Sequence, residues 1–246
     1  MATTGHTIKA FDEELDTLRA TISEMGGLAE AAIREAMEAL VRRDADAAAL
    51  VVRRDKKIDA LEAEIERQAV QIIALRAPMA DDLREVVAAL KIAGVVERIG
   101  DYAKNIAKRV ASLEDSKIRP LSLLPEMARI AGEMVHNVLD AFAQRDARKA
   151  EAVCERDAAV DDFYNSIFRS LLTHMMENPH NITPATHLLF VAKNLERIGD
   201  HATNVAEMVY FAATGEHLAD RAKGADTTDI GAGDLGAGDV GAADDD

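Results

Sequence analysis

The second half of the chain repeats the first, and this internal repeat is the strongest constraint on the fold. The pentapeptide ERIGD occurs at 97–101 and again at 196–200. In addition, RRDADAAALVVRRDKKID at 42–59 aligns with QRDARKAEAVCERDAAVD at 144–161. A repeat of this length indicates one structural unit that is present twice. Whatever fold the first half adopts, we therefore expect the second half to adopt as well.

Each half contains three stretches with helical periodicity. Apolar residues around the first ERIGD occupy positions 92, 96, 99, 103, 106 and 110, and those around the second occupy 188, 191, 195, 198, 202, 205 and 209. Alternating spacings of three and four place these side chains along one side of a helix that packs in a bundle. Pro78, Pro120 and Pro179 lie in three of the breaks between these stretches. We expect helices at 8–42, 46–77, 81–113, 122–144, 147–177 and 184–213.

This pattern predicts an all-α protein of two tandem three-helix bundles related by the repeat. The first bundle is expected at 8–115 and the second at 120–214, with KIRPLSLLP at 117–125 as the joint. Asp81 and Thr183 are the expected N-caps of the third and sixth helices. The Asp, Gly and Ala-rich tail at 215–246 has too few apolar residues to order itself, so we expect it to be disordered.

Charge and cysteine content exclude several classes of function. The formal net charge of -15 argues against a nucleic-acid-binding protein, because phosphate contacts need clustered Lys and Arg. A single cysteine, Cys154, allows neither an intramolecular disulfide framework nor a thiolate zinc site. The N-terminal stretch lacks a signal peptide's apolar core, and no run reaches the ~20 apolar residues of a membrane span. We expect a soluble, cytoplasmic protein.

Acidic pairs with a spacing of four residues recur at matched positions in both halves. Like charges at this spacing repel on a helix, and in the ERIGD segments they fall on the side away from the apolar seam. Counting back from the turns near 78–79 and 180 places the two pairs of each half within about one helical turn of each other. Oxygen ligands grouped in this way suit magnesium, manganese, calcium or iron. The predicted metal ligands are Asp55, Asp59, Glu97, Asp101, Asp157, Asp161, Glu196 and Asp200.

The residues inside each ERIGD add two expectations. Gly100 and Gly199 cost about 1 kcal/mol each within a helix relative to Ala, and they would let a neighbouring helix come close. Arg98 and Arg197 are expected to form structural salt bridges, with anion binding as the alternative.

Two other functions fit the same residues. Without metal, the acids would form a docking face for basic partner surfaces. A carboxylate-bridged di-iron enzyme would need Glu-x-x-His motifs on core helices, and 133–136 (EMVH) and 177–180 (ENPH) have these letters, although a proline interrupts the second. Metal content and oxygen consumption distinguish the three hypotheses.

The sequence resembles the PhoU family of phosphate-signalling regulators. ERIGDYAKNIAKR (97–109) and ERIGDHATNVAE (196–207) carry the resemblance, supported by ISEMGGLAEAAI (22–33), VLDAFAQRD (138–146) and LLTHMMENP (171–179). The resemblance covers about residues 8–214 and implies two tandem three-helix bundles whose acid-x-x-x-Asp motifs hold multinuclear metal clusters. All four motifs match, and the metal is open among iron, manganese, magnesium and zinc.

The same resemblance implies a non-enzymatic function. Members of the family connect a phosphate ABC transporter, on its cytoplasmic ATPase side, to a sensor histidine kinase. They repress phosphate uptake and the phosphate-starvation response (the Pho regulon) when phosphate is plentiful. The family acts in the cytoplasm as a homo-oligomer, commonly a dimer, and reaches the membrane only through its partners. The Asp-rich tail is not part of the family pattern.

Overall fold

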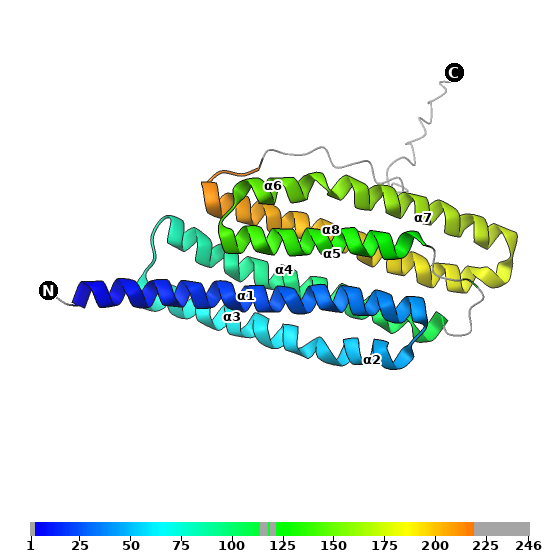
Figure 1. Cartoon of the computed structure of the whole chain (residues 1–246), viewed down its shortest axis with the longest axis horizontal. Helices are drawn as coiled ribbons and strands as arrows, with labels where there is room; N and C mark the ends of the chain where they lie inside the picture. Colours follow the sequence, from blue (N-terminus) through cyan, green and yellow to red (C-terminus); the bar gives the residue numbers. More distant parts are fainter. Residues whose placement is uncertain (1–2, 114–117, 119–121, 219–246) are drawn as a thin grey trace, which may run out of the picture.

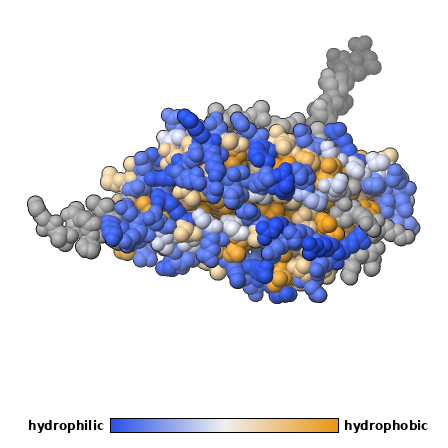
Figure 2. Space-filling model, in the orientation of Figure 1, coloured by the Kyte–Doolittle hydropathy of each residue, from blue (hydrophilic) through white to orange (hydrophobic). Residues whose placement is uncertain are grey.

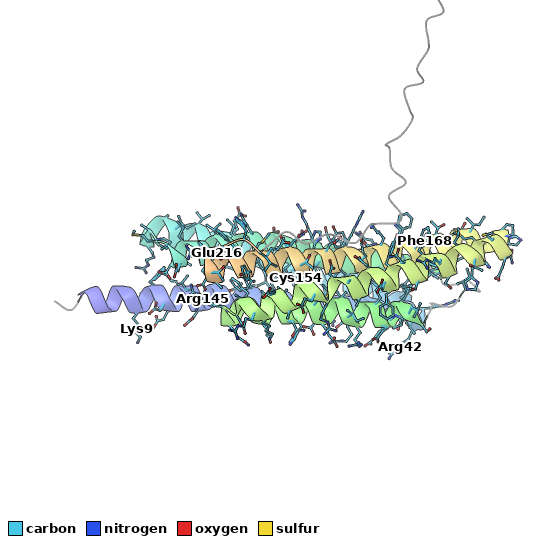
Figure 3. All side chains as sticks on the ribbon, turned by 90° about the horizontal axis from the view of Figure 1, so that it is seen from above. Lys9, Arg42, Arg145, Cys154, Phe168 and Glu216 are labelled. Carbon is cyan, nitrogen blue, oxygen red and sulfur yellow. The ribbon has the colours of Figure 1, made fainter. Side chains whose placement is uncertain are left out.

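The computed structural model shows an elongated helical molecule (Figure 1). It describes residues 3–113, 118 and 122–218. The predicted disorder of the tail therefore lies outside the described residues from 219 onward. Seen from above, Lys9 and Phe168 lie toward opposite ends of the molecule (Figure 3).

The two repeats form two three-helix bundles that lie side by side along their length (Figure 1), so the predicted fold is confirmed. In the first bundle, α1 (Thr3–Arg42) and α4 (Asp81–Arg109) pack with an outer helix that is split into α2 (Ala45–Arg54) and α3 (Lys56–Arg76). In the second, the corresponding helices are α5 (Leu123–Gln144), α8 (Ile182–Thr214) and the split pair α6 (Ala147–Glu155) and α7 (Asp157–Glu177). Short 3₁₀ turns, Ala111–Leu113 and Pro179–Asn181, follow α4 and precede α8.

The splits correct the expectation of continuous helices at 46–77 and 147–177. The Ile58 N–H donates to the Asp55 carbonyl at 2.8 Å, and the Ala159 N–H donates to the Arg156 carbonyl at 3.1 Å. These bonds reach back three residues rather than four, so the chain tightens for one turn and then continues as a helix. The break falls at Asp55 in the first repeat and at Arg156, one residue before Asp157, in the second, so each lies at or beside the first acid of a predicted pair.

The apolar seams are buried as predicted. All the seam positions of α4 and α8 are at most 1% exposed. Helix α4 packs against α8 as well as against α1, and α5 packs against both α1 and α8. The buried side chains form one continuous cluster that spans both repeats. The two bundles therefore share a single core, and Cys154 is an ordinary buried member of it.

The repeat is visible in backbone detail at the turn after the first helix of each bundle. Arg43 and Arg145 both adopt the left-handed conformation, with φ of 56° and 53°. The next residue caps the following helix: the Asp44 carboxylate accepts from the Ala47 N–H, and the Asp146 carboxylate accepts from two N–H groups of α6. Matched turns and caps start α2 and α6 in the same orientation.

The predicted N-caps of the third and sixth helices are wrong. Asp81 is the first residue of α4 and its side chain binds Arg84 instead, with Arg84 Nη2 2.5 Å from Asp81 Oδ1. Helix α8 already begins at Ile182, which places Thr183 and Pro184 inside its first turn. A proline is tolerated there because the first backbone N–H groups have no partner in the helix. No helix in the described part of the chain is long and apolar enough to cross a membrane.

Candidate metal-binding grooves

The acidic pairs of the first repeat lie along the contact between α3 and α4, here called the first acidic groove. Asp55, at the α2–α3 junction, is only 5% exposed. Lys104 of α4 reaches it, with Lys104 Nζ 2.5 Å from Asp55 Oδ2, and the same ammonium also pairs with Asp101. One cation thus links acids from two neighbouring helices, which places Asp55 and Asp101 at the same height along the groove.

Glu97 lies one turn before Asp101 on α4 and faces the same groove. Burial raises the pKa of Glu97, and the negative charges of Asp101, Glu62 and Asp59 raise it further. Because Asp59 and Glu62 belong to α3, their influence shows that acids of both helices lie near one another. The structure therefore brings together the four predicted residues of the first repeat, and it adds Glu62, which the repeat pattern does not indicate.

The acids of the second repeat lie along the matching contact between α7 and α8, here called the second acidic groove. The Glu196 side chain is only 12% exposed, with Lys193 Nζ 2.8 Å from its Oε1 atom. Burial raises the pKa of Glu196; Lys193 opposes the shift, and the charges of Asp200 and Asp161 add to it. The other carboxylate oxygen, Oε2, is buried and accepts no hydrogen bond from the described residues. Glu196 is thus more enclosed than its place on the helical wheel predicts.

Gly100 and Gly199, which have no side chain, allow the first acid of each quartet to lie close to the facing helix. A Cβ atom at Gly100 would lie 2.8 Å from Ile58 Cδ1 and 3.5 Å from Asp55 Oδ1. A Cβ atom at Gly199 would lie 3.3 Å from Asp157 Oδ1. The prediction that these glycines permit close approach of a neighbouring helix is confirmed.

The chemistry of the grooves fits a hard or borderline cation. Each groove collects carboxylate oxygens from two helices. Lys104 already places a positive charge between two of them. Glu196 Oε2 is buried without a hydrogen bond from the described residues, so it can still accept one or bind a cation. Within the described ranges, however, no three His, Cys, Asp or Glu side chains converge as ligands of one metal ion would. Metal binding therefore stays a prediction.

Comparison with known proteins places both repeats in one family. The model of the PhoU domain matches residues 22–110 and 124–209. The chain belongs to the PhoU family. The "phosphate-specific transport system accessory protein PhoU homolog" of Zymomonas mobilis is 58% identical over 223 residues, which cover 90% of this chain and 94% of the relative. Its counterpart in Caulobacter vibrioides is 50% identical over 222 residues, 89% of this chain and 96% of the relative.

Solved PhoU structures share the fold. The crystal structure of PhoU from Pseudomonas aeruginosa superposes with a TM-score of 0.80 at 36% identity, covering 84% of this chain and all of that chain. The phosphate transport system regulatory protein PhoU from Streptococcus pneumoniae gives a TM-score of 0.79 at 28% identity, over 85% of this chain and 99% of that one. The resemblance drawn from the ERIGD motifs is confirmed.

The arginines of the two PhoU motifs lie between the grooves, where α4 meets α8. Tyr102 and His201, which are equivalent in the repeat, stack edge to face with ring centroids 5.2 Å apart. The Arg197 guanidinium carbon lies 5.9 Å from the centroid of the Tyr102 ring. Neither Arg98 nor Arg197 forms a salt bridge with a described residue. Arg197 therefore contributes a cation–π contact between the bundles, in place of the expected salt bridge.

The di-iron arrangement is not built by the described residues. Glu133 binds Arg156, with 2.8 Å between Oε2 and Nη2, whereas His136 Nδ1 lies 3.1 Å from Glu30 Oε2 on α1. Both side chains are on the surface of α5, and the segment 177–180 is exposed at the α7–α8 turn. Neither Glu-x-x-His motif points its side chains into the bundle core.

A groove of about 520 Å³ between α1 and α5 has no signal in the sequence. Its floor includes Ile33, Met37 and Ala128, and charged side chains form its rim. Most of this face of the PhoU fold is hydrophilic, with small hydrophobic patches between the charges (Figure 2). The floor residues have the same periodicity as core residues, so the sequence cannot distinguish this groove from packed core. It shares no residue with the acidic grooves.

Proposed function

We propose that the chain is an accessory protein of a phosphate-specific transport system. In this proposal it is a cytoplasmic negative regulator of phosphate uptake and of the phosphate-starvation response. It couples the ATPase side of a phosphate ABC transporter to a sensor histidine kinase. The supporting observation is the extent of the likeness: relatives named as accessory proteins of a phosphate-specific transport system match over 94% and 96% of their own length. Both acidic grooves lie inside the two matched domains.

The proposed protein is not an enzyme and acts through its surfaces. It works as a homo-oligomer, a dimer, with no nucleic acid partner, and it meets the membrane only through the transporter and the kinase. Deleting its gene is expected to raise phosphate-starvation gene expression in phosphate-rich medium. Unchanged expression after deletion would count against the regulatory role.

The proposal includes metal binding in both acidic grooves. Bound divalent or iron cations would offset repulsion among the carboxylates and join α3 to α4 and α7 to α8. The ligands would be the eight acids predicted from the repeat. The enclosed carboxylates with raised pKa support this assignment, because a dication nearby would stabilise their charged form.

Elemental analysis of the purified protein tests the metal assignment. Asp101→Asn combined with Asp200→Asn should lower the metal content, because each substitution removes one anionic ligand per groove. The matched control is Glu24→Gln with Glu151→Gln, which removes the same charge from exposed positions outside the grooves. Equal metal content in the two double variants would refute the assignment.

A metal-free docking face is the second candidate, and the lysines favour it. Lys104 and Lys193 already supply a cation to each groove. In that case the wild-type protein would contain no metal. The Asp101→Asn and Asp200→Asn variant would still lose binding to the kinase or the transporter in a pull-down assay.

A further inference from the structure

The split outer helix of each bundle presents one exposed face to solvent, and the two faces are equivalent in the repeat. The first outer face, on α2 and the start of α3, consists of Asp46, Ala49, Arg53, Lys56, Lys57 and Ala60. The second outer face, on α6 and α7, consists of Arg148, Glu151, Glu155, Ala158, Ala159 and Asp162. Every one of these residues is exposed, and the spacing places each set within about a third of the helix circumference.

The two outer faces carry opposite charge. The first has three basic residues and one acid, and the second has three acids and one basic residue. Where both repeats have a charge at matched positions of the face, the sign is reversed: Asp46 corresponds to Arg148, and Arg53 corresponds to Glu155. Within the described residues, no ion pair neutralises the three basic residues of the first face or the three acids of the second.

The neighbouring arginines show how charges with a structural role behave in this repeat. Arg54 and Arg156 are equivalent and have the same sign. Each pairs with the first helix of its own bundle: Arg54 Nη1 lies 2.9 Å from Glu35 Oε2, and Arg156 Nη2 lies 2.8 Å from Glu133 Oε2. The charges that hold a bundle together are therefore alike in both repeats, whereas those of the outer faces are opposite and contribute no such contact.

The two outer faces point away from each other. Helices α2 and α3 pack on α1 and α4, whereas α6 and α7 pack on α5 and α8. The outer helices thus lie on opposite sides of the four long helices (Figure 1). In the first repeat the buried residues Ala48, Val51 and Ile58 fall on the other side of the helix from Arg53. The two faces cannot meet within one molecule, but the first face of one molecule can meet the second face of another.

We infer that a second copy of the chain docks on the outer faces, so that the first outer face of one molecule binds the second outer face of the next. This inference rests on the proposed homo-oligomer and names the surface on which its copies meet. A partner that is only acidic would use the first face and leave the second unmatched, whereas a second copy matches both in sign and in number of charges. The contact is head to tail, so a pair has one outer face of each kind still open to further copies.

Contacts between exposed charges are weak and are screened by salt, so this association depends on ionic strength. Sedimentation of the full chain over a range of protein concentrations, at about 0.02 M and about 0.5 M NaCl, measures it. The average mass should rise with protein concentration at low salt and rise less at high salt.

Charge reversal identifies the surface. Lys56→Glu with Lys57→Glu makes both outer faces acidic, and Glu151→Lys with Glu155→Lys makes both basic. Either double variant should need about tenfold or more protein to associate at low salt, because like charges now face each other. An equimolar mixture of the two variants should associate again, since each supplies the face that the other lacks. Lys91→Glu with Lys108→Glu, at exposed positions of α4, is the control with the same change in net charge and should associate as wild type does.

The outcomes separate this inference from the proposed homo-oligomer. If wild-type protein is monomeric at every concentration and salt, both fail. If it associates and the reversal variants behave like the control, the homo-oligomer stands and the outer faces are excluded as its surface. An effect of the lysine reversal alone would mean that an acidic segment, such as 219–246, occupies the first face, which also refutes the inference. Should a reversal variant not fold, Lys56→Gln with Lys57→Gln and Glu151→Gln with Glu155→Gln remove the same charges and should weaken association in the same way.

Discussion

Glu85 is a buried carboxylate at the joint between the two bundles. It lies on α4 with its side chain only 3% exposed. Its Oε1 atom is 2.5 Å from Arg19 Nε on α1, and its Oε2 atom is 2.6 Å from Arg145 Nη2 at the end of α5. One acid therefore connects three helices, two from the first repeat and one from the second. Replacing it by glutamine keeps its shape and removes its charge.

The size of the expected loss follows from how exposed the partners are. Breaking a buried ion pair costs about 3–5 kcal/mol when a charge is left without a partner in the interior. Here the arginines are less confined: the Arg145 side chain is 43% exposed, and Arg19 is 23% exposed and keeps its ion pair with Asp16. Water can solvate both cations in part. We therefore expect Glu85→Gln to lower the free energy of unfolding by about 2–3 kcal/mol.

Urea and thermal unfolding followed by circular dichroism measure this loss. For a chain of this size the expected fall in melting temperature is about 4–12 °C, at about 2–4 °C per kcal/mol. The control is Glu35→Gln, which also removes an ion pair between two helices, with Arg54, but from side chains that are 32% and 52% exposed. That variant should lose less than about 1 kcal/mol. If Glu85→Gln is no less stable than Glu35→Gln, then burial does not make the Glu85 ion pairs more stabilising than the exposed Glu35–Arg54 pair, and the reasoning is refuted.

Three further changes test smaller parts of the structure. Gly27→Ala should stabilise the fold by about 1 kcal/mol, because nothing lies within 4 Å of the new Cβ. Gly26→Ala should destabilise it by about 1–2 kcal/mol, because its Cβ would meet Leu139 Cδ1 at 2.1 Å. Equal denaturation midpoints for the two variants would contradict the packing of Gly26 against Leu139. Burial and three acids raise the pKa of Glu97 above its ordinary value of 4.5, so ionisation of Glu97 lowers the stability of the fold as the pH rises through that range. Glu97→Gln should therefore stabilise metal-free protein at pH 7 but not at mildly acidic pH. An equal gain at both pH values in urea titrations would show that the charge of Glu97 is not the cause. Asp146→Ala removes the N-cap of α6 and should lower the free energy of unfolding by about 1 kcal/mol in the same assay. An unchanged free energy of unfolding would show that the cap does not stabilise the helix.

The sequence predicted the packing of the long helices because their periodicity is a direct consequence of burial. Every seam position predicted on α4 and α8 is buried. The break at Asp55 had no such signal, since the residues on both sides of it continue the same helical pattern. A single tightened turn rotates the following side chains around the helix axis by only a fraction of a turn. The spacing of apolar residues does not detect so small a rotation. Only the three-dimensional positions of α2 and α3 relative to α4 reveal it.

The acidic grooves were predictable in composition but not in electrostatics. Matched acid pairs and turn lengths were enough to place four carboxylates of each repeat along one pair of helices. Lys104 and Lys193 were not predicted, because an isolated lysine on a helix is usually a solvated surface residue, and its partner on another helix is invisible in the sequence. Glu62 was missed for the same reason: it lies three residues after Asp59, and that spacing alone does not predict an acidic cluster.

The helix break that the pattern missed bears directly on how the acids are tolerated. Asp55 occupies the N-cap position of α3, and Asp157 is the first residue of α7. The backbone hydrogen bonds nevertheless continue through the first junction: the Asp55 N–H donates to the Val51 carbonyl, and the Asp59 N–H donates to the Asp55 carbonyl, both at 3.3 Å. Positive charge for Asp55 therefore comes from the neighbouring helix rather than from a helix start. The Lys104 ammonium of α4 pairs with both Asp55 and Asp101 and offsets the repulsion between these acids. The tightened turn thus lies where a lysine, and by our proposal a metal ion, approaches the most enclosed aspartate of the first groove.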